Sequence, residues 1–204
     1  MNEESFNRDK GDQEWAGVCE QILLYLRNRA QPELYTKLIE KVRERVLLLS
    51  ADEFKKQTEM EEGEDLMPTE ELWAYLSHSL DRPIINRDAC PEEFQSYVIA
   101  HECAEYIELV PYLQVGKHES RDDKTMSRQI TGGRAAHEIG IRAEYTEAKG
   151  DTKLEKYHTY ISMMIRRWIE LARQKPANAK GRITKLDEEL ALRQRVFEEI
   201  MRSD

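Results

Sequence analysis

The chain has 204 residues and a formal net charge of −9, with 35% charged and 40% hydrophobic residues. This length is enough to bury a core without disulfides, and the acidic balance argues against a protein that coats nucleic acid over its whole surface. No apolar run approaches the ~20 residues of a membrane-spanning helix, and the three cysteines have unrelated spacings, so we expect a cytoplasmic protein without a membrane segment.

The N-terminal part of the chain is predicted to be a polar tail followed by a helix pair. Residues 1–13 are polar and acidic, which is typical of a disordered tail. Apolar residues then recur every three or four positions in residues 15–29 and again in residues 33–49. With Pro32 between them, these two stretches predict two antiparallel helices.

The middle of the chain combines an acidic segment with the best strand candidate. Residues 52–71 contain nine acids and two lysines, which is typical of a solvated surface segment, and residues 61–68 read as a loop. A helix is expected to start at Thr69. Residues 82–86, Arg-Pro-Ile-Ile-Asn, predict a short strand, and Pro83 confines it to a strand start or a sheet edge.

The second half of the chain predicts further helices. They lie at 91–109, 131–149, 152–174 and 184–202, separated by a loop at 114–131, a break at Gly150 and a linker at 174–181. The fold class is therefore mainly α, an α+β domain with at most a small sheet and about six helices. We expect a tail at 1–13, one helical domain at 14–175, and a linker with a C-terminal helix at 176–204.

The segment His101-Glu102-Cys103-Ala104-Glu105 carries the most informative pattern. Residues four apart project from the same face of a helix, so His101 and Glu105 are placed to bind one ion. Glu102 lies about 100° further around the helix, beside that ion. The H-E-x-x-H motif uses this geometry: two ligands hold zinc while the intervening glutamate takes a proton from the metal-bound water.

A third ligand must come from another element, and the helix predicted at 131–149 is the best supplier. His137 lies near its start, and Glu144 is seven residues further on the same face. Two imidazoles and one carboxylate, from His101, His137 and Glu105, form a common catalytic zinc ligand set. Glu144, or alternatively Glu138, is expected to orient His137 or to serve as an alternative ligand.

Residues 83–148 resemble the zincin metallopeptidases in which a later helix supplies a glutamate ligand. The resemblance implies a metal ligand at His101 and a general base at Glu102, with Ile84 and Ile85 lining a substrate cleft at a strand edge. The sequence departs from the family because Glu105 stands where the family has histidine, and His137 stands roughly where it has the distal glutamate. The resemblance implies a zinc-dependent, or other divalent metal-dependent, hydrolase that acts on a peptide or protein substrate.

Two other interpretations remain open. His101 and Glu105 also fit an ordinary ion pair on a helix, and a metal at this position could be structural rather than catalytic. Residues 166–185 contain seven basic residues and one acid, so the protein could instead be a non-enzymatic helical interaction protein that binds through this segment and the acidic segment 52–71. Binding to nucleic acid is not expected.

Overall fold

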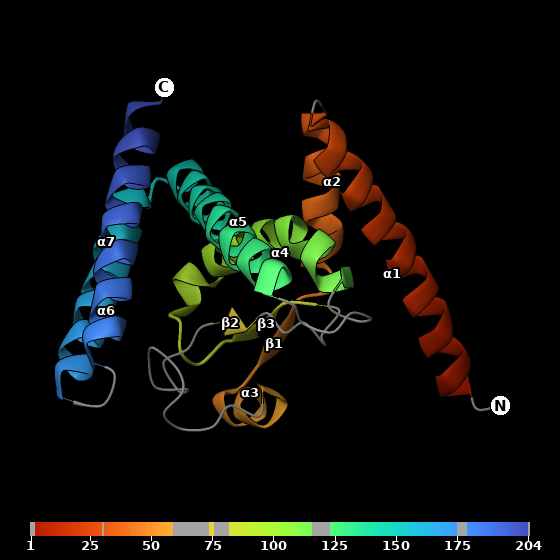
Figure 1. Cartoon of the computed structure of the whole chain (residues 1–204), viewed down its shortest axis with the longest axis horizontal. Helices are drawn as coiled ribbons and strands as arrows, with labels where there is room; N and C mark the ends of the chain where they lie inside the picture. Colours follow the sequence, from red (N-terminus) through yellow and green to blue (C-terminus); the bar gives the residue numbers. More distant parts are fainter. Residues whose placement is uncertain are drawn as a thin grey trace.

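The computed structural model describes residues 3–29, 31–58, 74–75, 82–115, 123–174 and 179–203 and shows a mainly α-helical protein (Figure 1). The described part holds seven α-helices, one 3-10 turn and a small sheet. None of its helices has the length and apolar content needed to cross a membrane. The α-helices are α1 (Glu3–Asn28), α2 (Pro32–Arg43), α3 (Ala51–Thr58), α4 (Gln95–Val115), α5 (Asp123–Gly150), α6 (Leu154–Gln174) and α7 (Ala179–Arg202).

Helix α4 is the centre of the fold. In Figure 1, α1 and α2 lie on one side of it, and α6 and α7 lie on the other side beyond α5. Cys103 and Ile107 on α4 are buried in a cluster shared with α1 and α2, whereas Tyr97 and Val98 are buried in a cluster shared with α5, α6 and α7. A helix that is apolar on both sides is a core helix, so the ionisable residues on α4 lie in the interior and need partners there.

Helices α6 and α7 pack side by side and against α5. The predicted boundaries of α6 are confirmed to within two residues, because its apolar stripe has a clear helical period. All seven apolar positions predicted for this helix are buried: Leu154, Tyr157, Ile161, Ile165, Trp168, Ile169 and Ala172.

The sheet has three short strands in the order β1 (Leu47–Leu49), β3 (Ile84–Asn86) and β2 (Ala74–Tyr75). Strand β3 confirms the predicted strand and begins directly after Pro83. It pairs with β1 in parallel and with β2 in antiparallel orientation, so both of its edges are hydrogen-bonded. The expectation that Ile84 and Ile85 line a cleft at a sheet edge is therefore wrong, and both side chains are fully buried.

Several predicted helix boundaries are also wrong. Residues 47–49 form a strand rather than the end of a helix. Three consecutive leucines are compatible with either element, and hydrogen-bonded pairing with β3 stabilises the strand. Residues 74–75 form a strand where a helix was expected, and the rest of that helix lies outside the described residues. The helix expected to end before Pro111 continues to Val115, with Pro111 inside its C-terminal part.

Other differences concern elements that are longer than predicted. Helix α5 begins at Asp123, so the Thr131-Gly-Gly-Arg stretch lies inside a helix and not at its start. Helix α7 begins at Ala179 and runs through Gly181. Helix α3 occupies part of the acidic segment, and α1 extends back to Glu3 across most of the expected tail. The glycines and polar residues in these segments each destabilise a helix by at most about 1 kcal/mol, and the neighbouring helical turns offset this cost.

Candidate metal centre

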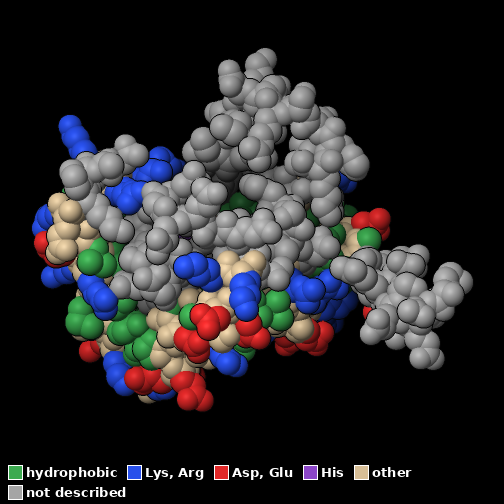
Figure 2. All heavy atoms as spheres, turned by 90° about the horizontal axis from the view of Figure 1, so that it is seen from below, with side chains coloured by type: hydrophobic (Ala, Val, Ile, Leu, Met, Phe, Trp, Pro, Cys, Tyr) green, Lys and Arg blue, Asp and Glu red, His purple; other side chains and the backbone are tan. Residues whose placement is uncertain are grey.

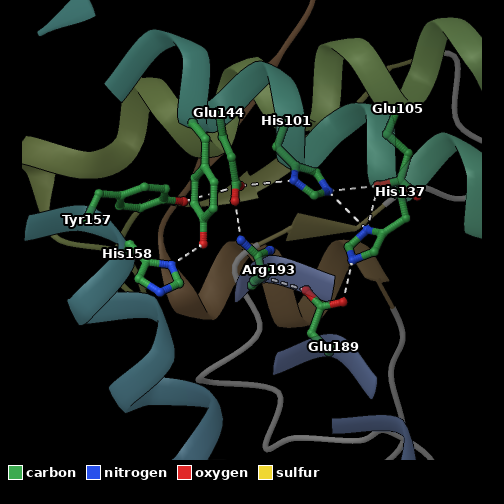
Figure 3. A network of polar contacts seen from close by, with 9 residues as sticks. His101, Glu105, His137, Glu144, Tyr157, His158, Glu189 and Arg193 are labelled. Atoms are coloured by element: carbon green, nitrogen blue, oxygen red, sulfur yellow. Dashed lines mark hydrogen bonds and ion pairs between the residues drawn. The ribbon is translucent and has the colours of Figure 1, made fainter. Parts of the chain in front are cut away.

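Two residues on α4 and one on α5 bring three ligand atoms together (Figure 3). His101 Nε2 lies 2.9 Å from Glu105 Oε2 and 3.1 Å from His137 Nδ1, and the remaining side of the triangle, His137 Nδ1 to Glu105 Oε2, is 3.3 Å. His101 and Glu105 meet because they are one turn apart on α4, and His137 meets them because α5 packs closely against α4. The structure thus places all three predicted ligands in one cluster.

Each histidine also binds a carboxylate through its other ring nitrogen. His101 Nδ1 lies 3.0 Å from Glu144 Oε2, and His137 Nε2 lies 2.9 Å from Glu189 Oε2. An ionised carboxylate only accepts hydrogen bonds, so each of these nitrogens carries the proton and donates it. The inner nitrogens, His101 Nε2 and His137 Nδ1, both face the Glu105 oxygen. They donate to it when the rings are protonated, and they are the atoms that can bind an ion when the rings are neutral.

The role predicted for Glu144 needs a correction. Glu144 was expected to orient His137, but it lies seven residues along α5 and reaches His101 on α4 instead. Glu138 orients neither histidine, because its carboxylate forms ion pairs with Arg142 at 2.8 Å and with Arg195 at 2.9 Å. The carboxylate that orients His137 comes from α7, an element that the sequence did not connect with the site.

Gly140 makes room for the His101 ring. A Cβ atom at position 140 would lie 2.8 Å from both Cδ2 and Nε2 of His101, well inside van der Waals contact. Gly140 lies one turn after His137 and one turn before Glu144 on the same helix. The absence of a side chain at this position therefore lets the imidazole lie flat against α5, between the two residues that contact it.

The buried groups perturb one another strongly. Burial alone would lower the pKa of His101 and His137, but Glu144 and Glu105 raise the pKa of His101 well above its usual value, and Glu105 and Glu189 raise that of His137 to about 9. Burial would raise the pKa of Glu105, but hydrogen bonds from the two histidines lower it to about 2. These directions show that a positive charge at the centre of the triangle is favoured.

Glu102 differs from the other carboxylates of the site. Burial raises the pKa of its carboxyl group to about 7, against the opposing effect of His101, with Glu105 contributing a further increase. The side chain is half-buried, and within the described part of the chain no hydrogen bond to its carboxylate is found. A carboxylate with a pKa near neutrality and a free lone pair is suited to accept a proton in a reaction.

The triangle fits a divalent ion in both size and charge. A tetrahedral zinc ion with ligand distances of 2.0–2.1 Å separates its ligand atoms by about 3.3–3.4 Å, close to the 2.9–3.3 Å found here. Three carboxylates (Glu105, Glu144 and Glu189) and one guanidinium (Arg193) leave two negative charges uncompensated when both imidazoles are neutral. Two positive charges, from a divalent ion or from two protons, neutralise the site.

Sequence reasoning missed two residues of the site, Glu189 and Arg193 on α7. Their signal was present but weak: Leu186, Val196 and Ile200 form a buried stripe on this helix, and Arg193 lies in the same stripe. A charged residue at a core position of an amphipathic helix indicates a buried partner. The partner itself could not be named without the tertiary structure.

The structure describes part of the two charged segments of the alternative interpretation. Arg166 on α6 is exposed, and Arg173 pairs with Glu170 on the same helix. Most of the acidic segment 52–71 lies outside the described residues. On the face drawn in Figure 2, basic and acidic side chains are interspersed rather than gathered in separate patches.

Comparisons of the chain with protein-family models, with curated proteins and with solved structures gave no match.

Proposed function

We propose that the protein is a metal-dependent hydrolase of peptide or amide bonds. In this proposal a zinc or similar divalent ion is held by His101, Glu105 and His137. The observation that carries it is the triangle of three ligand atoms, whose two nitrogens are turned inward by hydrogen bonds on their outer sides. This arrangement of carboxylate, histidine and metal is common around protein-bound zinc.

Glu102 is the general base in this proposal. When bound, a divalent ion polarises a carbonyl group and makes water a better nucleophile near neutral pH. The Glu102 carboxylate, one position along α4 from His101, accepts the proton of the attacking water and passes it to the leaving amine. Burial, which raises the pKa of this carboxyl group to about 7 in the metal-free protein, supports the assignment.

The exposure of the site favours a catalytic over a structural metal. Structural zinc sites have four protein ligands and are closed to solvent. Among the described residues this group offers three ligands, and its outer members are partly open to solvent: the side chain of His137 is 34% exposed and that of Glu105 is 16% exposed. Water and a substrate carbonyl can approach from this side, whereas the opposite side, formed by His101 and Glu144, is buried.

Elemental analysis is the first test of the proposal. The full chain is purified without a metal-binding tag and compared with His101→Ala, and zinc, iron, manganese, cobalt and nickel are measured. About one divalent ion per chain is expected in the wild type and none in the variant. A wild-type protein that contains no metal and takes up none at micromolar zinc contradicts the proposal.

A second experiment separates catalytic from structural metal. Loaded wild type and Glu102→Gln are assayed on a mixed library of quenched fluorescent peptides. Cleavage by the wild type, lost in a variant that still binds metal, supports the hydrolase. Metal binding without cleavage of any peptide supports a structural site. If the protein is instead an interaction protein, neither change at the site matters, and neutralising Arg166 and Arg173 weakens partner binding.

A further inference from the structure

The two carboxylates that orient the histidines share one buried cation, Arg193 on α7. Its guanidinium donates to Glu144 Oε1 through one terminal nitrogen, and to Glu189 Oε1 through Nε at 2.5 Å. Arg193 is only 6% exposed although arginine is seldom buried. Figure 3 shows its head group lying between the two carboxylates, on the side away from the triangle.

Each of these carboxylates uses its second oxygen on a histidine. Glu144 Oε2 accepts from His101 Nδ1, and Glu189 Oε2 accepts from His137 Nε2. The result is a continuous chain of hydrogen bonds in which a single guanidinium links both imidazoles through both carboxylates. We infer that Arg193 is the positioning residue of the metal centre: it fixes the two carboxylates that set the tautomer and orientation of both histidine ligands. This inference rests on the proposed metal site.

The chemistry of arginine explains why this residue type lies here. Its planar group offers several N–H donors in a fixed geometry, so one side chain satisfies two carboxylates at once. It also stays protonated in a buried environment, and its charge helps to hold the pKa of both Glu144 and Glu189 below the usual range against the opposing effect of burial. Without it, neither carboxylate would have a cation on the oxygen that does not contact a histidine.

The origin of Arg193 makes α7 part of the centre. The three ligands come from α4 and α5, but the helix that fixes them is the last one in the chain. The sequence places α7 after a linker and gives no indication that it reaches the site. In the structure the site is complete only with α7 packed against α5.

Arg195 on the same helix provides a matched control. It pairs with Glu138 on α5 at 2.9 Å, so it also joins α7 to α5. Its side chain is 50% exposed and it contacts none of the carboxylates bound to the histidines. Arg195→Gln therefore removes a charge and an α5–α7 ion pair without touching the chain of hydrogen bonds that leads to the histidines.

The test is the zinc affinity of the full chain, measured by competition with a chromophoric chelator. Arg193→Gln is expected to weaken zinc binding about 10- to 100-fold, as loss of an outer partner of a metal ligand usually does, and Arg195→Gln is expected to leave it within about threefold. Imidazole ¹⁵N spectra of the zinc-loaded wild type should show His101 protonated at Nδ1 and His137 at Nε2. In Arg193→Gln the same spectra should show mixed tautomers.

Arg193→Lys is the second variant, in case Arg193→Gln does not fold. It keeps the charge but loses the planar group, and it is expected to weaken zinc binding about tenfold. Zinc affinity equal to wild type in a folded Arg193 variant overturns the inference and leaves the metal site standing. A wild type that binds no zinc overturns the metal site and the inference together, whereas zinc binding without hydrolysis overturns only the enzymatic role.

Discussion

Replacing Gly140 with alanine tests the geometry of the centre most directly. The added Cβ would lie 2.8 Å from Cδ2 and Nε2 of His101, whereas carbon atoms in contact are about 3.5–4.0 Å apart. The ring or the helix must therefore move by about 0.7–1.2 Å. His101 is held at Nδ1 by Glu144 and faces Glu105 at Nε2, so any movement of the ring lengthens at least one of these contacts.

The expected cost follows from two opposing effects. Overpacking a tight site costs about 1–3 kcal/mol, and replacing glycine by alanine inside a helix gains up to about 1 kcal/mol. The free energy of unfolding of Gly140→Ala should therefore fall by about 0–3 kcal/mol. Metal sites tolerate ligand displacements of only about 0.2 Å, so zinc affinity should fall at least about tenfold.

Gly17→Ala is the matched control for this variant. Gly17 also lies inside a helix, α1, but a Cβ there meets no atom within 4 Å. This variant should gain stability from helix propensity and leave zinc affinity unchanged. The two variants are compared by urea denaturation without metal and by chelator competition.

A double variant separates the clash from other effects of Gly140→Ala. Once His101 is replaced by alanine, the ring is gone, so adding Gly140→Ala should no longer destabilise the protein and should gain up to about 1 kcal/mol. The reasoning is refuted if Gly140→Ala behaves like Gly17→Ala in the wild-type background, or if it costs the same with and without the His101 ring.

Three further predictions concern the metal and the protons of the site. Glu102→Gln should keep the metal and lose at least about 100-fold in kcat, and unchanged turnover would remove Glu102 from the reaction. Zinc at 100 times its Kd should raise the free energy of unfolding by about 2.7 kcal/mol in the wild type but not in His101→Ala, as thermal denaturation can check. Because the pKa of His137 is raised to about 9 and that of His101 is also raised, zinc must displace two protons, so affinity should rise by up to about 100-fold per pH unit between pH 6 and 8. An affinity that does not change with pH in chelator competition contradicts this.

The free energy of unfolding of the metal-free protein should fall as the pH rises, whereas the zinc affinity should increase. A raised histidine pKa contributes stability that is fully present below the unfolded value of about 6.5 and is lost as the pH rises through the folded value. For His137 that window extends from about 6.5 to about 9. Zinc should therefore stabilise the protein more at pH 8.5 than at pH 6. Equal stabilisation at both pH values would contradict the idea that zinc replaces protons on the two histidines.

The parts of the fold that the sequence predicted well are those with a strong local period. Helix α6 was found almost to the residue because seven apolar side chains repeat along one face. The boundaries of α4 and α5 were missed because their ends contain Pro111 and the glycine pair at 132–133, which are local breakers that long helices tolerate. Strand β1 was missed because a run of leucines has no period, and only the pairing with β3 makes it a strand.

The candidate site, like the fold, was predicted where a local pattern was present. His101 and Glu105 follow from helix spacing alone, and the position of His137 followed from matching the ligand set of a known chemistry. The partners of the histidines did not follow, because Glu144 and Glu189 reach them across helix contacts that no local pattern encodes. Gly140 likewise has no sequence signal beyond its presence between two site residues.

The charge balance of the site connects its chemistry to the fold. With both imidazoles neutral, the carboxylates exceed Arg193 by two charges, and the interior does not tolerate such an excess. Two protons on the histidines or one divalent ion neutralise this excess of negative charge equally well. The same three helices can therefore pack around the protonated site and around the metal-bound site, and a higher pH favours the metal. A proton, however, satisfies one histidine and one carboxylate, whereas a metal ion binds all three ligand atoms at once. The metal should therefore tie α4 to α5 directly and hold α7 through Glu189 and Arg193, so that zinc slows amide hydrogen exchange in all three helices.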